Sequence, residues 1–192
     1  DTSRMEPALP IIERRLDLLA QTHPGDKEAR ISLLVAKARV LQEGLGNDAE
    51  ATQTLEQLLA EAPDNDEVAQ GLSRLYRKQG RLEDGIELLR ARWAELDRDD
   101  ALRFVAMTKT LAEVLDQEGH DPKGALETVE SALQTLPEEP RLLVLKVHFA
   151  RALHEQTKLA EGLAALATPA ELLEAADLYR GPLKDGAKAT EA

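Results

Sequence analysis

The chain has 192 residues, with 24 lysines and arginines against 36 aspartates and glutamates, a formal net charge of −12 and no cysteine. This length suits one domain, or two small ones, with a real core. The lack of cysteine excludes disulfides, thiolate metal ligands and a cysteine nucleophile, and it fits the cytoplasm while remaining compatible with a bacterial periplasm. The strong negative charge argues against broad binding to nucleic acids or anionic membranes. No apolar run approaches the length of about 18 residues that a membrane span needs.

Composition and apolar spacing both favour helices over strands. Aromatic residues make up only 3% of the chain, whereas the abundant types, Ala, Leu, Glu, Arg and Gln, are strong helix formers. Leu34, Ala38, Leu41 and Leu45 recur at intervals of four, three and four residues, which places them on one face of a helix. The sequence therefore predicts an all-α chain.

Proline, glycine and aspartate residues mark regular breaks between the helical stretches. The strongest breaks fall at Pro24, Pro63, Asp97, Pro137 and Pro169. Weaker breaks divide the stretches again at Gly46, Gly80, Gly119 and Thr157. In chain order the breaks predict about ten short helices, at residues 8–22, 27–44, 48–61, 66–78, 82–96, 99–118, 122–135, 140–156, 159–166 and 170–179.

Several residues at these breaks have expected local roles. Gly80 and Gly119 suit the left-handed backbone conformation that ends a helix. Asp121, which precedes a proline, is expected to cap the start of one helix, and Asn47 or Asp48 the start of another. Because all loops are short, consecutive helices should pack as antiparallel hairpins.

The strongest breaks recur at a nearly constant interval. The intervals are 39, 34, 40 and 32 residues, an average of about 36, which is the length of a helix-turn-helix repeat. A small or apolar residue lies twelve positions before each of the first four breaks, and a larger apolar residue follows four positions later. These pairs are Ile12 and Leu16, Ala51 and Leu55, Gly85 and Leu89, and Ala125 and Val129.

At this point the stretch 66–97 resembles a tetratricopeptide repeat. That family has a large-then-small pair and an aromatic residue in its first helix, a turn glycine, and then a bulky, a small and a bulky residue in its second helix. Here these residues are Leu72, Ser73, Tyr76, Gly80, Leu82, Gly85 and Leu89. Residues 27–63, 99–137 and 140–169 resemble further copies. Two departures are Arg92, where a second-helix alanine is expected, and Thr157, which replaces a turn glycine.

The resemblance implies a right-handed α-solenoid of antiparallel helix hairpins, as a single tetratricopeptide-like domain over residues 1–180. Repeats at about 27–63, 66–97, 99–137 and 140–169 are expected to follow a lone helix at 8–22 and to precede a terminal helix at 170–179. Residues 181–192 are expected to form a flexible tail. The first helix matches a second helix of the repeat, which predicts either that the chain is a piece of a longer protein or that this helix is a cap.

Catalytic and cofactor-binding patterns are missing from the sequence. None of the motifs GxSxG, HExxH, GxxxxGK[ST] and GxGxxG occurs. His148 and His154 lie six residues apart on one predicted helix, so they point to different faces and do not readily share a metal. We therefore expect no enzyme, no cofactor and no bound metal.

The only tryptophan, Trp93, lies on one stripe of its predicted helix with Leu89 and Leu96. Packing against the following helix is the expected role of Trp93, and an exposed anchor for a partner is the alternative. Tyr76 is expected in the core because of its place in the repeat.

In tetratricopeptide repeats the first helices line the concave face, so the resemblance implies that their non-core side chains bind partners. By register these residues are Arg39, Gln42, Gln70, Arg74, Arg77, Lys109, Glu113, Asp116, Arg151 and His154. Four of them would form a basic row: Arg39, Arg74, Lys109 and Arg151. Since the arginine guanidinium forks onto carboxylates, such a row suits an acidic peptide or a C-terminal carboxylate. Ordinary solvated charges are the alternative interpretation.

The sequence thus predicts a non-catalytic protein–protein interaction scaffold that binds a peptide or partner helix in its concave groove. One alternative is a structural or assembly subunit of a multiprotein or envelope complex, which acts through its convex face or its ends and can associate with itself. A second alternative is a regulatory domain of a larger protein. The expected partner is another protein or peptide, and neither nucleic acid nor membrane insertion is expected.

Overall fold

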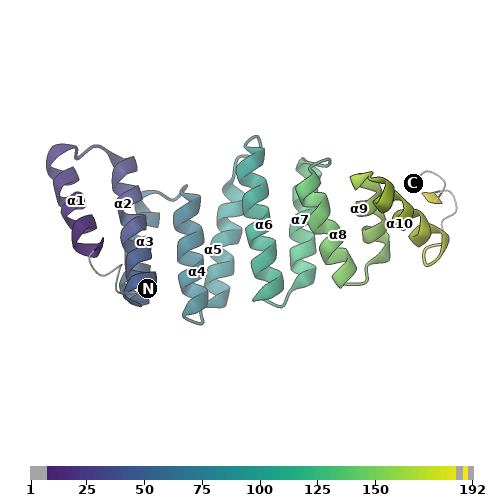
Figure 1. The fold of residues 1–192 in the computed structure, drawn as a ribbon, viewed down its shortest axis with the longest axis horizontal. Helices are drawn as coiled ribbons and strands as arrows, with labels where there is room; N and C mark the ends of the chain where they lie inside the picture. The colour runs from purple at the N-terminus through teal and green to yellow at the C-terminus, as the bar shows by residue number, and fades with distance from the viewer. Residues whose placement is uncertain (1–7, 185–187, 190–192) are drawn as a thin grey trace. The chain divides into compact units, whose positions relative to one another are not determined.

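A computed structural model of the chain describes residues 8–184 and 188–189. This part contains α-helices and one π-helical turn but no strand, which confirms the predicted all-α class (Figure 1). The elements are α1 (Ala8–Thr22), α2 (Lys27–Arg39), η2 (Val40–Gly44), α3 (Asp48–Glu61), α4 (Asp66–Lys78), α5 (Leu82–Glu95), α6 (Ala101–Gln117), α7 (Pro122–Thr135), α8 (Pro140–Ala152), α9 (Gln156–Leu166) and α10 (Pro169–Arg180). Residues 185–187 and 190–192, half of the predicted tail, lie outside the described residues.

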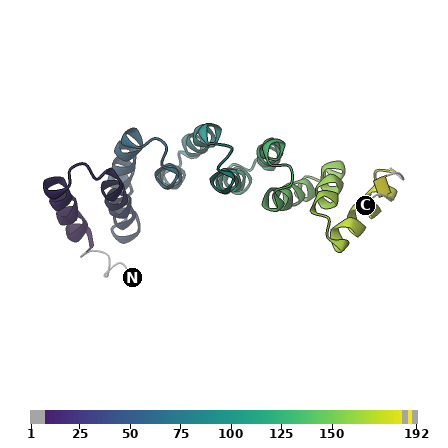
Figure 2. The same ribbon diagram turned by 90° about the horizontal axis from the view of Figure 1, so that it is seen from above.

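The chain divides into two compact units, Asp1–Arg92 and Trp93–Ala192. In the first unit α1 packs on α2, α2 on α3, and α3 on α4. In the second unit α6 packs on α7, α7 on α8, α8 on α9, and α9 on α10, and α6 also contacts α8. Within each unit, helices that follow one another along the chain therefore lie side by side and are joined by short turns (Figures 1 and 2).

Short polar side chains cap the starts of most helices. Oδ1 of Asp121 accepts a hydrogen bond from the Gly124 N–H at 2.8 Å, directly before Pro122, as predicted. At α3 the cap is Asn47, whose Oδ1 accepts from the Glu50 N–H at 3.2 Å. Such caps stabilise a helix by about 1 kcal/mol each. Other capping side chains are Asp26, Asn65, Asp100, Glu139 and Thr168.

The turns inside the helix pairs only partly follow the predicted glycines. Gly80 has a φ of +78°, as predicted. The same prediction is wrong for Gly119, because the neighbouring His120 adopts the left-handed conformation instead, with a φ of +50°. Histidine is one of the few residues enriched in this region, so a glycine in the turn after a helix does not by itself locate the left-handed position.

The turn between α8 and α9 is displaced from its predicted place. The break expected at Thr157 is wrong, since α8 ends at Ala152 and α9 begins at Gln156. His154 lies in this turn with a φ of +57°, and the Glu155 N–H closes the turn by donating to the Ala150 carbonyl at 2.9 Å.

The long first helix predicted at residues 27–44 is interrupted by the π-helical turn η2. A π turn accommodates one extra residue in a helix, and here the Leu45 N–H donates to the Val40 carbonyl at 3.2 Å. This turn keeps Leu41 buried but leaves Leu45 exposed, so Leu45 does not belong to the apolar stripe predicted with Leu34 and Ala38.

Small residues let α4 and α5 approach each other closely. Ser73 Oγ donates to the Gly85 carbonyl at 2.8 Å, and a Cβ on Gly85 would lie only 2.9 Å from the Ser73 carbonyl oxygen. The core beside them contains Ala38, Leu41, Ala51, Leu55, Leu58, Val68, Leu72 and Leu75. Half-buried Tyr76 packs against this core, and its hydroxyl donates to Glu56 Oε1 at 2.9 Å.

Trp93 packs against the following helix, as predicted. Its indole Nε1 donates to Thr108 Oγ1 of α6 at 2.8 Å, and its ring stacks on Phe104 at a centroid distance of 5.6 Å. The Arg98 guanidinium lies 4.1 Å from the Phe104 ring centroid and 4.7 Å from that of Trp93. The only tryptophan therefore belongs to the packing of the second unit.

A group of charged side chains joins α7, α8 and α9. Lys158 Nζ donates to Glu130 Oε2 at 2.7 Å, while Lys146 Nζ lies 3.9 Å from Glu130 Oε1 and 3.2 Å from Glu161 Oε2. The hydrogen bond from Lys158 to Glu130 is the main cause that raises the pKa of Lys158 above its ordinary value of 10.5.

Because the folded-state pKa of Lys158 is raised, its contribution to stability is complete below about pH 10.5 and is lost as the pH rises through the folded value. Substitution Glu130→Gln should therefore destabilise the chain by about 0.2–1 kcal/mol near pH 9, since the pair is partly exposed. Urea unfolding should show that this difference shrinks as the pH rises above about 10.5, by the same linkage. Glu87→Gln, an exposed change of equal charge on α5, is the control and should show no such pH dependence. A difference that stays constant over this range would contradict the assignment.

Candidate binding surfaces on the first helices

The predicted groove residues lie on α2, α4, α6 and α8 or on the π turn that continues α2, with one exception. Exposed members on helices are Arg39, Arg74, Lys109 and Arg151, and half-buried members are Gln42, Gln70, Arg77, Glu113 and Asp116. His154 is exposed, but it lies in the turn after α8 and not on the predicted helix, because α8 ends at Ala152. None of these residues belongs to the buried core.

In the first unit, residues of α2, η2 and α4 surround a small hollow of about 40 Å³. The predicted residues Arg39 and Arg74 both line this hollow, and so do Gln42 and Gly71. Arg39 Nη2 lies 3.6 Å from Glu67 Oε1, also in the lining. The structure therefore brings the two predicted arginines of this unit together, but it places a carboxylate beside one of them.

Arg74 and Arg77 are neighbouring cations on one turn of α4. Arg77 is half-buried, and its Nε donates to the Ser73 carbonyl at 3.3 Å. Burial, and then the like charge of Arg74, lower the pKa of Arg77 below its ordinary value. In residues 8–184 and 188–189 no carboxylate forms an ion pair with Arg74. Arg74 is therefore an exposed cation beside a second cation, an arrangement that an added anion would stabilise.

In the second unit, α6 and α8 enclose a larger hollow of about 510 Å³, lined by Val105, Ala106, Lys109, Pro140, Arg141, Val144 and Leu145. Most of this lining is apolar, and Val144 is 54% exposed. Sequence reasoning identified Lys109 but missed the apolar residues. The signal was available: residues 142–145 are four consecutive apolar residues on one helix, so they cannot all face the core.

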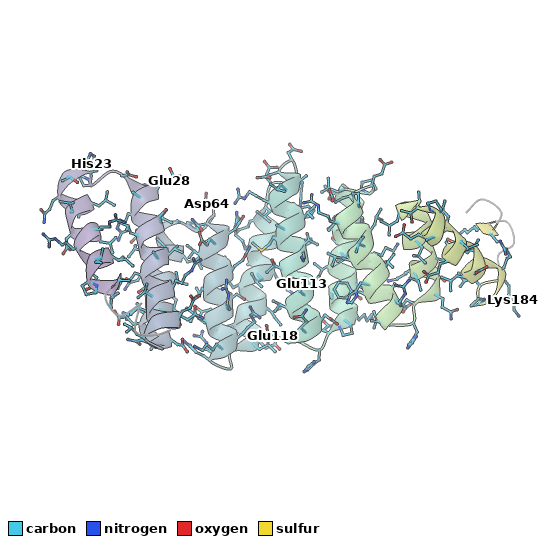
Figure 3. The ribbon with its side chains drawn as sticks, viewed as in Figure 1. His23, Glu28, Asp64, Glu113, Glu118 and Lys184 are labelled. Carbon is cyan, nitrogen blue, oxygen red and sulfur yellow. The ribbon has the colours of Figure 1, made fainter. Side chains whose placement is uncertain are left out.

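The predicted cations of the second unit have acidic partners. Lys109 Nζ lies 3.7 Å from Glu113 Oε1 on the same helix, where Figure 3 labels Glu113. Arg151 Nη2 donates to Glu174 Oε1 of α10 at 2.7 Å. All four side chains are more than two-fifths exposed, and such pairs contribute only about 0–1 kcal/mol. A ligand carboxylate could therefore replace either partner at little cost.

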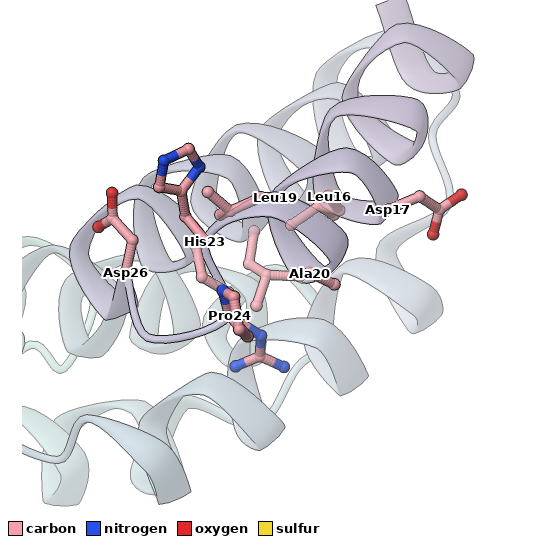
Figure 4. A pocket seen from close by; sticks show the side chains of 9 residues that line it. Leu16, Asp17, Leu19, Ala20, His23, Pro24 and Asp26 are labelled. Atoms are coloured by element: carbon pink, nitrogen blue, oxygen red, sulfur yellow. The ribbon is translucent and has the colours of Figure 1, made fainter.

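A further hollow of about 330 Å³ lies between α1 and α2 (Figure 4). Two of its polar side chains, His23 and Asp26, already have local hydrogen-bond partners. His23 Nδ1 lies 2.9 Å from Thr22 Oγ1, and Asp26 Oδ1 accepts from the Ala29 N–H at 3.0 Å as the cap of α2. This hollow reflects the loose packing of α1, which contains no buried residue.

The described residues offer neither a metal site nor a membrane span. Within 8–184 and 188–189 no group of three or more His, Asp or Glu side chains could hold a metal ion. In the same part of the chain no helix combines the length and the apolar character needed to cross a membrane.

Comparison with known proteins relates part of this chain to one family and its fold to several solved structures. Residues 41–107 match the model of the tetratricopeptide repeat family. A Podosopora anserina putative kinesin light chain with nearly identical TPR-like repeats is similar in structure, with 21% identity over 96% of this chain and 90% of that chain and a TM-score of 0.55. A single-residue variant of that protein has 21% identity over 99% and 90% of the two chains and a TM-score of 0.53. No curated protein sequence matches this chain.

The APC/C hetero-tetramer Cut9–Hcn1 is also similar, with 14% identity over 99% of this chain and 36% of that chain and a TM-score of 0.50. At these identities the likeness concerns the fold. It confirms the predicted fold class, an all-α solenoid of helix hairpins.

Proposed function

We propose that this chain, whose residues 41–107 match the tetratricopeptide repeat family model, is a non-catalytic scaffold that binds a peptide or a partner helix on the first helices of its repeats. The fold itself suggests a protein–protein interaction scaffold. Stacked repeats present rows of side chains over an extended surface, which suits a protein partner better than a small molecule.

The observation that carries the proposal is the apolar hollow between α6 and α8. Val144 exposes 54% of its surface in this hollow, and covering a valine or leucine side chain contributes about 1.5–3 kcal/mol. Lys109 and Arg141 also line the hollow. An apolar side chain of a partner, with an acidic residue near it, fits this chemistry.

Arg74 supplies a second contact in the first unit. Its guanidinium is exposed, it has no carboxylate partner in the described part of the chain, and it repels Arg77. A carboxylate of the partner would gain a charge-assisted hydrogen bond and would relieve this repulsion. Partner segments that bind the first unit are therefore expected to carry an acidic residue, and those that bind the second unit an apolar anchor.

The test is a selection of peptides from a displayed random library on the whole chain, followed by calorimetric titration of the best binders. Substitution Val144→Glu should weaken their binding at least tenfold, because it places a charge in the apolar hollow. Arg74→Glu should weaken acidic binders about three- to tenfold and should reduce the salt dependence of Kd. Leu45→Glu changes an exposed apolar residue outside both hollows and should leave Kd unchanged.

Two outcomes would contradict the groove proposal. One is that selected peptides bind the Val144→Glu and Arg74→Glu chains as tightly as the unchanged chain. The other is that Leu45→Glu weakens binding as much as Val144→Glu does, since a loss of that kind would not locate the contact on α8.

A further inference from the structure

Helix α1 carries an exposed face that is both apolar and cationic. Ile11, Arg14, Arg15 and Leu18 follow the spacing of one helical face and are all exposed. The exposed fraction is 58% for Ile11 and 57% for Leu18. Neither arginine has an ion-pair partner in the part of the chain that the structure describes. This face therefore combines two uncovered apolar side chains with two charges that are free to pair.

Helix α10 carries a face of the same geometry and the opposite charge. Ala170, Leu173, Glu174 and Asp177 have the same spacing and are all exposed, and the exposed fraction of Leu173 is 63%. Glu174 pairs with Arg151 at 2.7 Å and Asp177 with Arg180 at 3.6 Å. Both pairs are more than two-fifths exposed, so exchanging them for new partners costs little.

We propose that the face of α1 in one copy of this chain packs against the face of α10 in a second copy, head to tail. The contact covers Ile11 and Leu18 with Leu173 and Ala170, and it sets Arg14 and Arg15 against Glu174 and Asp177. In the described part of the chain these apolar side chains are exposed, and a second copy would cover them. This inference concerns α1 and α10 and does not depend on the groove function proposed for α4, α6 and α8.

Charge decides between this arrangement and a symmetric dimer. Two α1 faces would bring four arginines together, an arrangement that like-charge repulsion disfavours. The carboxylates of α10 already have partners within the chain, so two α10 faces would gain no new pair of opposite charges. The contact between α1 and α10 gives the arginines of α1 carboxylate partners. Such a heterologous contact leaves one free face at each end, so it produces open chains or rings of copies and not a single dimer.

Sedimentation velocity of the whole chain at low salt, from about 1 µM to 1 mM, tests the proposal over the range expected of a weak interface. The average mass should rise with concentration and fall when salt is added. In the variant Arg14→Glu/Arg15→Glu the association constant should fall at least tenfold. The same loss is expected in Glu174→Arg/Asp177→Arg. A mixture of these two variants, and a single chain with all four substitutions, should regain association, because opposite charges then face each other again.

The control variant Lys27→Glu/Arg90→Glu changes the net charge as much as the α1 variant does, at exposed positions away from both faces. It should associate like the unchanged chain. A chain that stays monomeric up to about 1 mM would overturn the proposal. So would failure of the mixture and of the four-substitution chain to regain association while circular dichroism shows that both are folded. Peptide binding in the α6–α8 hollow should be the same in the Arg14→Glu/Arg15→Glu variant, whose changes lie on α1, and this separates the test from that of the groove.

Discussion

Substitution Asp66→Ala should lower the free energy of unfolding of the first unit by about 3 kcal/mol. Arg92 of α5 is buried, with 8% of its side chain exposed, and its Nε donates to Asp66 Oδ1 of α4 at 2.7 Å. Its Nη2 also donates to the Asp64 carbonyl at 2.9 Å. Removal of Asp66 takes the 2.7 Å carboxylate partner away from a buried guanidinium. The same change removes an acidic side chain from the first turn of α4, where it interacts favourably with the helix dipole.

Substitution Arg92→Met should lower the free energy of unfolding clearly less than Asp66→Ala does. It removes the buried charge, and the carboxylate left behind has 20% of its side chain exposed to water. A double-mutant cycle should therefore give a coupling energy of at least about 1 kcal/mol, with the double variant more stable than the sum of the single changes predicts.

Urea unfolding followed by circular dichroism measures these differences. Asp84→Ala is the matched control, because it breaks an exposed ion pair in which Arg81 Nε lies 2.7 Å from Asp84 Oδ2. This change should cost no more than about 1 kcal/mol. The interpretation of the buried pair fails if the losses caused by Asp66→Ala and Asp84→Ala are equal.

The second large effect is expected from Gly85→Val, which should destabilise the first unit by about 2–4 kcal/mol through overpacking and the loss of a buried hydrogen bond. A Cβ at position 85 would lie 2.9 Å from both the Ser73 carbonyl oxygen and the Arg77 Cγ. The Arg77 side chain can move, but the Ser73 carbonyl is backbone, so α4 and α5 would have to separate. Separation would break the 2.8 Å hydrogen bond from Ser73 Oγ to the Gly85 carbonyl.

The stability of the Gly85→Ala chain should lie between that of the unchanged chain and that of the Gly85→Val chain. The gain in helix propensity of about 1 kcal/mol offsets part of the clash. Ala91→Val is the control on the exposed side of α5, and it should cost about 0.5 kcal/mol or less. Thermal unfolding of the three variants would test this order. A Gly85→Val chain as stable as the Ala91→Val chain would mean that α4 and α5 do not depend on a close approach at this point.

Helix positions followed directly from the sequence because helix starts are local events. The side chain of Asp121 needs only the N–H three residues later, and Asn47 does the same for α3. Gly85, a small residue of the repeat pattern, lies where α4 and α5 approach closely. In such cases the interacting residues lie a few positions apart or recur at a fixed interval, so a single sequence is enough to predict the interaction.

Where more than one residue could adopt the conformation that a turn requires, the sequence did not predict which residue does so. The left-handed residue of one turn is His120 and not Gly119, and the turn after α8 centres on His154 and not on Thr157. The extra residue of the first repeat is absorbed by a π turn, which leaves Leu45 exposed. In each case the packing of the two flanking helices selects one of several local conformations of similar energy.

The all-α class and the positions of most helices could be predicted from the sequence alone, since they depend on caps and periodicities within a few residues. Only the tertiary structure decided which charges are neutralised. Arg151 meets Glu174, 23 residues away, and Arg92 meets Asp66, 26 residues away. It also showed that Val144 lies in a hollow between α6 and α8. Coulombic pairing and burial act over a few ångströms in space, and the sequence distance between two side chains does not give that separation.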